Sequence, residues 1–110
     1  MVLAAGLGTR LRPLTDLRAK ALVPVGDRPA LAHVLDRLGV AGLTRVAVNA
    51  HHRADEVHAF VRAHGRGVSV SEEAELLGTA GGLARAADLL GREGDVLVWN
   101  ADILDRKSVV

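Results

Sequence analysis

A short glycine-rich run with two nearby cations is the part of the sequence best suited to chemistry. Its members are Gly6, Gly8, Thr9, Arg10 and Lys20. Glycines let backbone N–H groups approach an anion without a side chain in the way, and successive exposed amides form a concave anion site. Arg10 offers a bidentate fork for phosphate oxygens, and Lys20 adds a compact point charge. The run therefore predicts a loop that binds a polyphosphate.

The glycine pair alone is a weak signal. A dinucleotide-binding fingerprint requires a third glycine at position 11, where this chain has Leu11. A P-loop requires Gly-Lys-Ser/Thr at a set spacing, and none follows here. An ordinary strand-to-helix turn with solvated cations would carry the same two glycines. Both interpretations stay open on these residues alone.

Two further segments carry candidate site residues. Asn100 and Asp102 follow just past the apolar stretch 95–99 (DVLVW). One carboxylate can hold Mg²⁺ while the ion keeps water and takes its other ligands from phosphates, although an aspartate can also simply cap a strand end. Residues 75–82 (ELLGTAGG) predict a flexible loop leading into a helix, with Thr79 as the N-cap.

Other polar clusters are expected to be ordinary surface. Glu72, Glu73 and Glu75 indicate a solvated acidic run rather than a catalytic pair. The adjacent residues His51 and His52 point in different directions, and no third ligand is spaced for zinc. We therefore expect no metal site at the two histidines.

The elements that must position these residues alternate between strand and helix. Apolar residues at i, i+3, i+4 and i+7 from Leu31 predict a helix that ends near Gly39 or Gly42, with Pro29 suited to its first turn. The predicted strands are 1–3, 44–49, 68–71 and 95–99, the last of them buried on both faces, and the other predicted helices are 54–64 and 78–90.

This order of elements predicts the fold class. Strands that alternate with helices form right-handed crossovers, so we expect an α/β, Rossmann-like fold with a mostly parallel sheet and helices on both faces. Ligands of such sheets lie beyond the carboxyl ends of the strands. Here those places are the glycine loop and the residues after Trp99.

Composition bounds the class of protein. With 110 residues, of which 49% are hydrophobic, the chain is one globular domain at most. A net charge of +1 with dispersed cations argues against nucleic-acid binding. The sequence has no cysteine, hence no disulfide or thiolate metal site, and no apolar run of membrane-spanning length. With no secretory signal ahead of the first strand, we expect a cytoplasmic protein.

Residues 3–25 closely resemble the signature of the sugar-1-phosphate nucleotidyltransferases. That signature is LAAGxGTRLxPLT, then a proline–lysine pair and a short apolar run. This chain has LAAGLGTRLRPLT at 3–15, Lys20, and ALVPV at 21–25. One departure is Ala19, which replaces the usual proline and should loosen the backbone approach to Lys20.

Two later segments extend the resemblance. Residues 77–82 are similar to the family's LGTAGG segment, which lies against the nucleobase and ribose, so Gly78 is implied to let the base approach the backbone. Asn100 and Asp102 match the family's Asn-Gly-Asp, which implies a nucleotide contact and the ligand of a catalytic Mg²⁺, while Ala101 replaces the glycine. The GTAGG form leans toward mannose-1-phosphate guanylyltransferases and N-acetylmuramate-1-phosphate uridylyltransferases.

The resemblance also implies a reaction and a glycosyltransferase-A-like nucleotidyltransferase fold. A sugar 1-phosphate attacks the α-phosphorus of a nucleoside triphosphate, with UTP or GTP favoured, and pyrophosphate leaves. Arg10 would hold the departing pyrophosphate, and Lys20 the α-phosphate and the sugar phosphate. The other nucleotide-binding residues implied by the match are Ala5, Gly6, Gly8 and Thr9.

Family enzymes are considerably longer than this chain, and their later half supplies the sugar pocket and a second acidic metal ligand. Residues 1–110 are therefore expected to be the nucleotide-binding half of a truncated domain, with weak nucleotide binding and slow or no turnover. Missing strands would leave a sheet edge uncovered, so we also expect self-association.

Three other functions would make different demands on the same residues. A non-catalytic nucleotide-sensing module would keep the glycine loop but would not need Asp102. A phosphocholine-type cytidylyltransferase shares the opening signature and stays open as an alternative. A dinucleotide-dependent oxidoreductase would need the third glycine and an acidic residue after the second strand. The chain has Asn49-Ala50-His51 there, which argues against an oxidoreductase.

Overall fold

The computed structural model describes residues 1–6, 17–43, 45–64, 67–91 and 94–101, and the structural statements below refer to these. Four strands pair in parallel to form one sheet in the order β5-β4-β1-β6. Their bounds are β1 Val2–Leu3, β4 Val46–Ala50, β5 Val68–Glu72 and β6 Trp99–Asn100. The α/β fold with a parallel sheet is thus confirmed.

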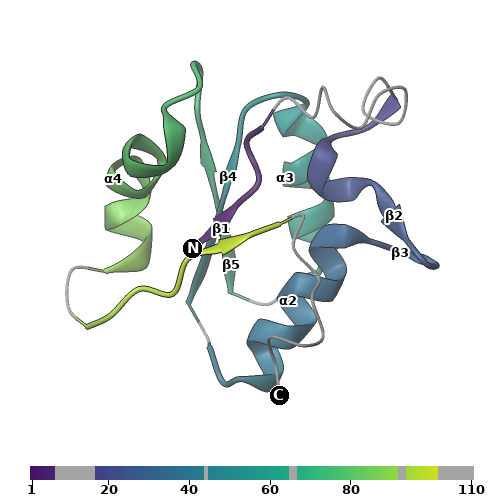
Figure 1. The fold of residues 1–110 in the computed structure, drawn as a ribbon, viewed down its shortest axis with the longest axis horizontal. Coiled ribbons are helices and arrows are strands. Elements are labelled where there is room, and N and C mark those ends of the chain that lie inside the picture. Colours follow the sequence, from purple (N-terminus) through teal and green to yellow (C-terminus); the bar gives the residue numbers. More distant parts are fainter. Residues whose placement is uncertain (7–16, 44, 65–66, 92–93, 102–110) are drawn as a thin grey trace.

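Helices cover both faces of the sheet, as predicted. On one face α2 (Ala30–Val40) and α3 (Ala54–His64) pack against Val46 and Val48 of β4, and on the other α4 (Gly78–Leu90) packs against Ala47. Figure 1 shows α4 standing apart from α2 and α3, with the strands between them. Alternation along β4 sends successive side chains to opposite faces, which is why a single strand contributes to both cores.

The larger core forms because the predicted helical stripe is fully used. Leu31, Val34, Leu35 and Leu38 of α2 are all buried, and Val57 and Val61 of α3 join them. Burying one such side chain contributes about 1.5–3 kcal/mol. The helix predicted at 54–64 is confirmed at both ends.

The connection between the glycine loop and α2 differs from expectation. It contains a small antiparallel hairpin, β2 (Pro24–Val25) and β3 (Arg28–Pro29), turning at Gly26, whose φ is +69°. Pro29 ends this hairpin and is the N-cap of α2, with φ −57° and ψ 146°. The prediction that Pro29 lies inside the first helical turn is therefore wrong by one residue.

The last predicted strand is shorter than expected. β6 begins at Trp99, and Val96, Leu97 and Val98 before it lie outside the sheet with 40–51% of their surface exposed. The prediction of a buried strand over 95–99 is wrong for 95–98, because β1 offers only two residues for pairing, Val2 to Trp99 and Leu3 to Asn100.

Smaller differences concern the ends of elements. Strand β4 covers 46–50 rather than 44–49, and residue 44 lies outside the described residues. Helix α4 begins at Gly78, with Leu77 as its N-cap, so the prediction of Thr79 as the N-cap is wrong.

Within the described residues, no helix is both long and apolar enough to cross a membrane. The cytoplasmic location stays a prediction.

Candidate functional site

A cleft at the carboxyl ends of β1, β4 and β6 brings together all of the predicted site residues that the structure describes. Those lining it are Ala5, Gly6, Lys20, Gly78 and Asn100. They come from four separate segments of the chain, and the position agrees with the rule for ligands of parallel sheets. The predicted residues Gly8, Thr9, Arg10 and Asp102 lie outside the described residues.

Lys20 lies beside the backbone of Gly6, at the start of the glycine loop. A Cβ atom built on Gly6 would be 3.5 Å from Lys20 Nζ and 3.7 Å from its Cδ. The lysine begins a short 3₁₀ turn, η2 (Lys20–Leu22), in which Leu22 N donates to Ala19 O at 2.9 Å. An ammonium beside glycine backbone provides a positively charged place for a phosphate group.

The backbone that leads into Lys20 is held more firmly than the sequence suggested. Ala19 is 1% exposed, and its N–H donates to Glu56 Oε1 at 2.8 Å. The other oxygen of Glu56 accepts from Arg53 Nη1 at 2.8 Å. The expectation that Ala19 loosens the approach to Lys20 is therefore wrong, because a carboxylate on α3 uses the N–H that proline would lack.

The polar floor of the cleft was not foreseen. Asn49, at the carboxyl end of an apolar strand, accepts with its Oδ1 from Ala4 N at 2.5 Å and from Ala5 N at 3.1 Å. Its Nδ2 donates to Glu73 Oε2 at 3.0 Å, and Glu73 Oε1 accepts from Leu77 N at 3.3 Å. A polar side chain at the end of a buried strand is the signal that could have indicated Asn49.

Glu73 is buried rather than solvated. It is 2% exposed, whereas its neighbour Glu72 has a side chain 60% exposed and pairs with His58 at 2.9 Å. The expectation of a solvated acidic run fails for Glu73 because its side chain lies on the floor of the cleft. His51 is also bound structurally, since its Nδ1 donates to Glu73 O at 2.7 Å.

Ala5 contributes differently from a free loop amide. Its N–H is bonded to Asn49 within the protein, and the same is true of Ala4. We therefore expect phosphate contacts to come from amides that follow Ala5. Ala5 itself lines the cleft.

Close packing explains the glycines of the GTAGG segment. A Cβ on Gly82 would lie 3.0 Å from both Asn49 Nδ2 and Glu73 Oε2, and a Cβ on Gly81 would lie 2.7 Å from Leu77 Cβ. Gly78 has φ +74°, a backbone conformation that residues other than glycine rarely adopt. The segment is thus shaped to bring α4 against the floor of the cleft.

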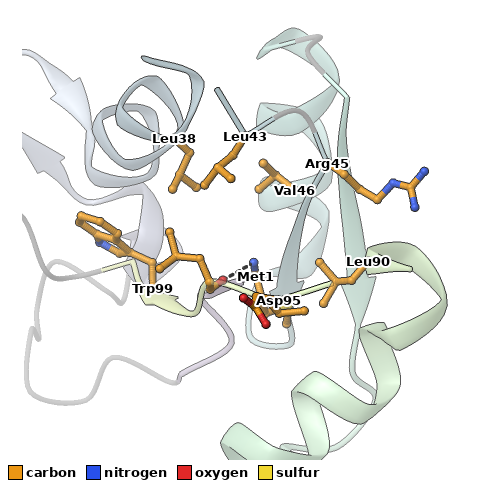
Figure 2. A pocket seen from close by; sticks show the side chains of 10 residues that line it. Met1, Leu38, Leu43, Arg45, Val46, Leu90, Asp95 and Trp99 are labelled. Atoms are coloured by element: carbon orange, nitrogen blue, oxygen red, sulfur yellow. Dashed lines mark hydrogen bonds between the residues drawn. The ribbon is translucent and has the colours of Figure 1, made fainter. Parts of the chain in front are cut away.

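A second hollow lies at the opposite ends of the strands, and Figure 2 shows it lined mainly by apolar side chains. Met1 and Trp99 border it, and the N-terminal ammonium donates to Leu97 O at 2.9 Å. Burial lowers the pKa of that ammonium. Because it faces the amino ends of parallel strands, this hollow is not the candidate site.

The comparison with known families agrees with the geometry of the cleft. The family model described as "Nucleotidyl transferase" matches residues 1–109. The chain belongs to the nucleotidyltransferase family. That membership accounts for Gly6, Lys20 and the start of the LGTAGG segment meeting at one end of the sheet.

Two curated nucleotidyltransferases show the relationship in sequence. N-acetylmuramate alpha-1-phosphate uridylyltransferase of Caulobacter vibrioides is 48% identical over 108 residues, which cover 93% of this chain and 44% of that protein. Mannose-1-phosphate guanyltransferase of Aspergillus fumigatus is 38% identical over 109 residues, which cover 94% of this chain and 30% of that protein. The chain thus spans less than half the length of either relative.

A solved structure shows the relationship in fold. HddC from Yersinia pseudotuberculosis, complexed with GMP-PN, superimposes with a TM-score of 0.79 and is 28% identical. The match covers 92% of this chain and 46% of that one. The chain therefore shares the fold of the corresponding part of HddC over almost its whole length.

Proposed function

We propose that residues 1–110 form the nucleotide-binding half of an enzyme that transfers a nucleoside monophosphate from a nucleoside triphosphate to a sugar 1-phosphate. The observation that carries the proposal is Lys20 Nζ lying beside the Gly6 backbone at the carboxyl end of β1. Family membership supports the reaction class. Relatives more than twice as long support assigning the sugar pocket to a part beyond these 110 residues.

Charge within the cleft orients the nucleotide in this proposal. Lys20 and Gly6 provide the positive end, while the Glu73 carboxylate faces the other wall, near Leu76 and Gly78. A triphosphate is attracted to the lysine and repelled by the carboxylate. The phosphates therefore lie over the glycine loop, and the nucleoside lies against the start of α4.

The chemistry requires positioning more than a strong base. An oxygen of the sugar phosphate, already ionised, attacks the α-phosphorus; the bond to the β-phosphate oxygen breaks, and pyrophosphate leaves. Lys20 stabilises the charge that builds on the α-phosphate, and we assign Gly8, Thr9 and Arg10 to the β- and γ-phosphates. Fixed geometry and complementary charge supply the rate enhancement for such transfers.

Magnesium is part of the proposal. Among the described residues, no group of three His, Cys, Asp or Glu side chains could hold a metal ion. A magnesium ion shared with substrate phosphates needs only one or two protein carboxylates, however. Asp102 comes next after Ala101, whose N–H donates to Leu3 O at 3.0 Å at the carboxyl end of β1. The ion, bound by Asp102, would neutralise charge on the phosphate oxygens.

The preferred base is proposed from the relatives. UTP and GTP are the candidates, because the two curated relatives are named a uridylyltransferase and a guanyltransferase. UTP is the better supported of the two, since the uridylyltransferase shares 48% identity with this chain against 38% for the guanyltransferase. The proposed acceptor is a sugar 1-phosphate.

The test is calorimetric titration of the chain with UTP, GTP and CTP, with and without Mg²⁺. We expect weak, Mg²⁺-dependent binding of UTP or GTP that falls at least tenfold in Lys20→Met and in Asp102→Ala. Glu72→Gln, a charge change at an exposed position, serves as the control. A folded chain that binds no nucleotide would overturn the proposal, and a preference for CTP would favour a cytidylyltransferase.

A further inference from the structure

We propose that Asn49 and Glu73 form a positioning pair that holds the two walls of the cleft at a fixed separation and thereby sets its affinity for nucleotide. The inference rests on the proposed function. One wall is the start of the glycine loop with Lys20, and the other is the N-terminus of α4 with residues 76–79. The pair lies between them and bonds to both.

The hydrogen bonds form a continuous chain from wall to wall. Ala4 and Ala5 donate to Asn49 Oδ1, Asn49 Nδ2 donates to Glu73 Oε2, and Leu77 N donates to Glu73 Oε1. Two backbone N–H donors at one end of the amide and a carboxylate at the other allow only this orientation of Asn49. Each polar atom of the two side chains thus has a partner of the opposite kind.

The backbones beneath the pair are fixed without it. Asn49 pairs with Ser71 in the parallel ladder of β4 and β5, and Glu73 N donates to Ala50 O at 2.7 Å. His51 Nδ1 donates to Glu73 O at 2.7 Å. A change in the side-chain bond is therefore expected to act on the walls of the cleft, not on the sheet.

Both side chains of the pair are buried, which makes the loss of their hydrogen bonds costly. Asn49 is 4% exposed and Glu73 is 2% exposed, so neither side chain can replace a lost partner with bulk water. Gly82 of α4 packs so closely on the pair that a Cβ there would lie 3.0 Å from both side chains. The helix that forms the second wall rests on these atoms.

Variants that exchange the donor and the acceptor of the Asn49–Glu73 hydrogen bond test whether the bond itself positions the walls, or whether these two side chains are merely required at their positions. Asn49→Asp brings two carboxylates together, and Glu73→Gln leaves an amide NH₂ facing either Asn49 Nδ2 or Leu77 N–H. In the double variant the bond is complete again: the new carboxylate accepts from Ala4, Ala5 and the new amide, whose oxygen accepts from Leu77. The double variant keeps the formal charge of the wild type.

The experiment measures both walls and the affinity in the whole 110-residue chain. Amide hydrogen exchange at Ala4, Ala5 and Leu77, measured without nucleotide, shows how firmly the hydrogen bonds hold the two walls. Calorimetry with UTP and GTP in Mg²⁺ measures the affinity. We expect each single variant to accelerate exchange at both walls and to raise Kd at least tenfold. The double variant is expected to restore exchange and to return Kd to within about threefold of wild type. Glu72→Gln is the matched control.

Folded single variants with wild-type exchange and Kd would overturn the inference. So would a double variant that keeps the defect or does not fold, including the case in which the single variants fail to fold. If the wild type binds no nucleotide, the proposed function fails instead. The exchange data then decide the pair alone: joint loss and joint recovery at both walls support it, and changes confined to one wall refute it.

Discussion

At the scale of single residues, this chain replaces a backbone constraint with a hydrogen bond. Ala19 stands where the family signature has proline, and its φ of −60° and ψ of 146° are values that proline also adopts. The N–H that proline would lack is bonded to Glu56 at 2.8 Å. Two different devices can therefore hold the same approach to Lys20, one through a ring and the other through a carboxylate.

A double-mutant cycle at these two positions tests that interpretation. Glu56→Ala leaves a buried N–H unsatisfied and is expected to lower the free energy of unfolding by about 1–3 kcal/mol. Ala19→Pro should destabilise the wild type, because the ring meets Glu56, but should stabilise the Glu56→Ala variant, because it removes the orphaned donor. Urea denaturation measures all four proteins. A proline effect of the same sign in both backgrounds would contradict the interpretation.

At the scale of elements, the hairpin and two helices meet at one carboxylate. Asp36 of α2 pairs with Arg28 of β3 at 2.5 Å and lies 3.7 Å from His64 Nε2 at the end of α3. The hydrogen bond from Arg28 lowers the pKa of Asp36, although burial acts against it. The carboxylate is half-exposed, so the pairing adds little to stability but links three elements.

The pH dependence follows from the direction of that shift. A lowered pKa in the folded state contributes stability that is present above the unfolded value of about 3.9 and is lost as the pH falls through the folded value. Asp36→Asn should therefore cost less than about 1 kcal/mol near pH 7 and nothing in strong acid. Urea denaturation over this pH range measures the difference, with Asp95→Asn, a change at another exposed carboxylate, as the control. A cost that persists in acid would point to packing instead of charge.

At the scale of the whole molecule, the described sheet has an apolar approach to one edge. β6 pairs only with β1 among the described strands, and the residues leading into it, Val96 to Val98, are 40–51% exposed. Exposed strand edges with apolar side chains favour pairing with another chain. This observation supports the self-association expected from the sequence, which stays a prediction.

Sedimentation velocity tests the association directly. We expect a monomer–dimer equilibrium in which the fraction of dimer rises with protein concentration. We expect Leu97→Lys to shift the protein toward monomer, because a charged side chain disfavours edge pairing. Val25→Lys places the same charge on an exposed apolar residue of the hairpin and serves as the control. A monodisperse wild-type monomer at high concentration would count against association.

Much of the fold was predictable because its signals are local. The apolar spacing in α2 and the helix over 54–64 are periodic patterns set by neighbours within a turn or two. The hairpin at 24–29 and the short β6 were not predictable in this way. A strand forms only where a partner strand offers residues to pair with, and β1 offers only two to β6.

The sequence by itself indicated the family, the fold class and several of the residues that line the cleft, since a glycine run, a lysine and a GTAGG run are readable within short segments. Only the tertiary structure decided that Glu73 lies buried beneath the cleft and that Ala19 is held by Glu56. The hydrogen bond that holds Glu73 joins it to Asn49, 24 positions away along the chain. The bond between Ala19 and Glu56 spans 37 positions. Which polar groups meet across such separations depends on how β4, β5, α3 and the glycine loop pack, and not on the local pattern around either residue.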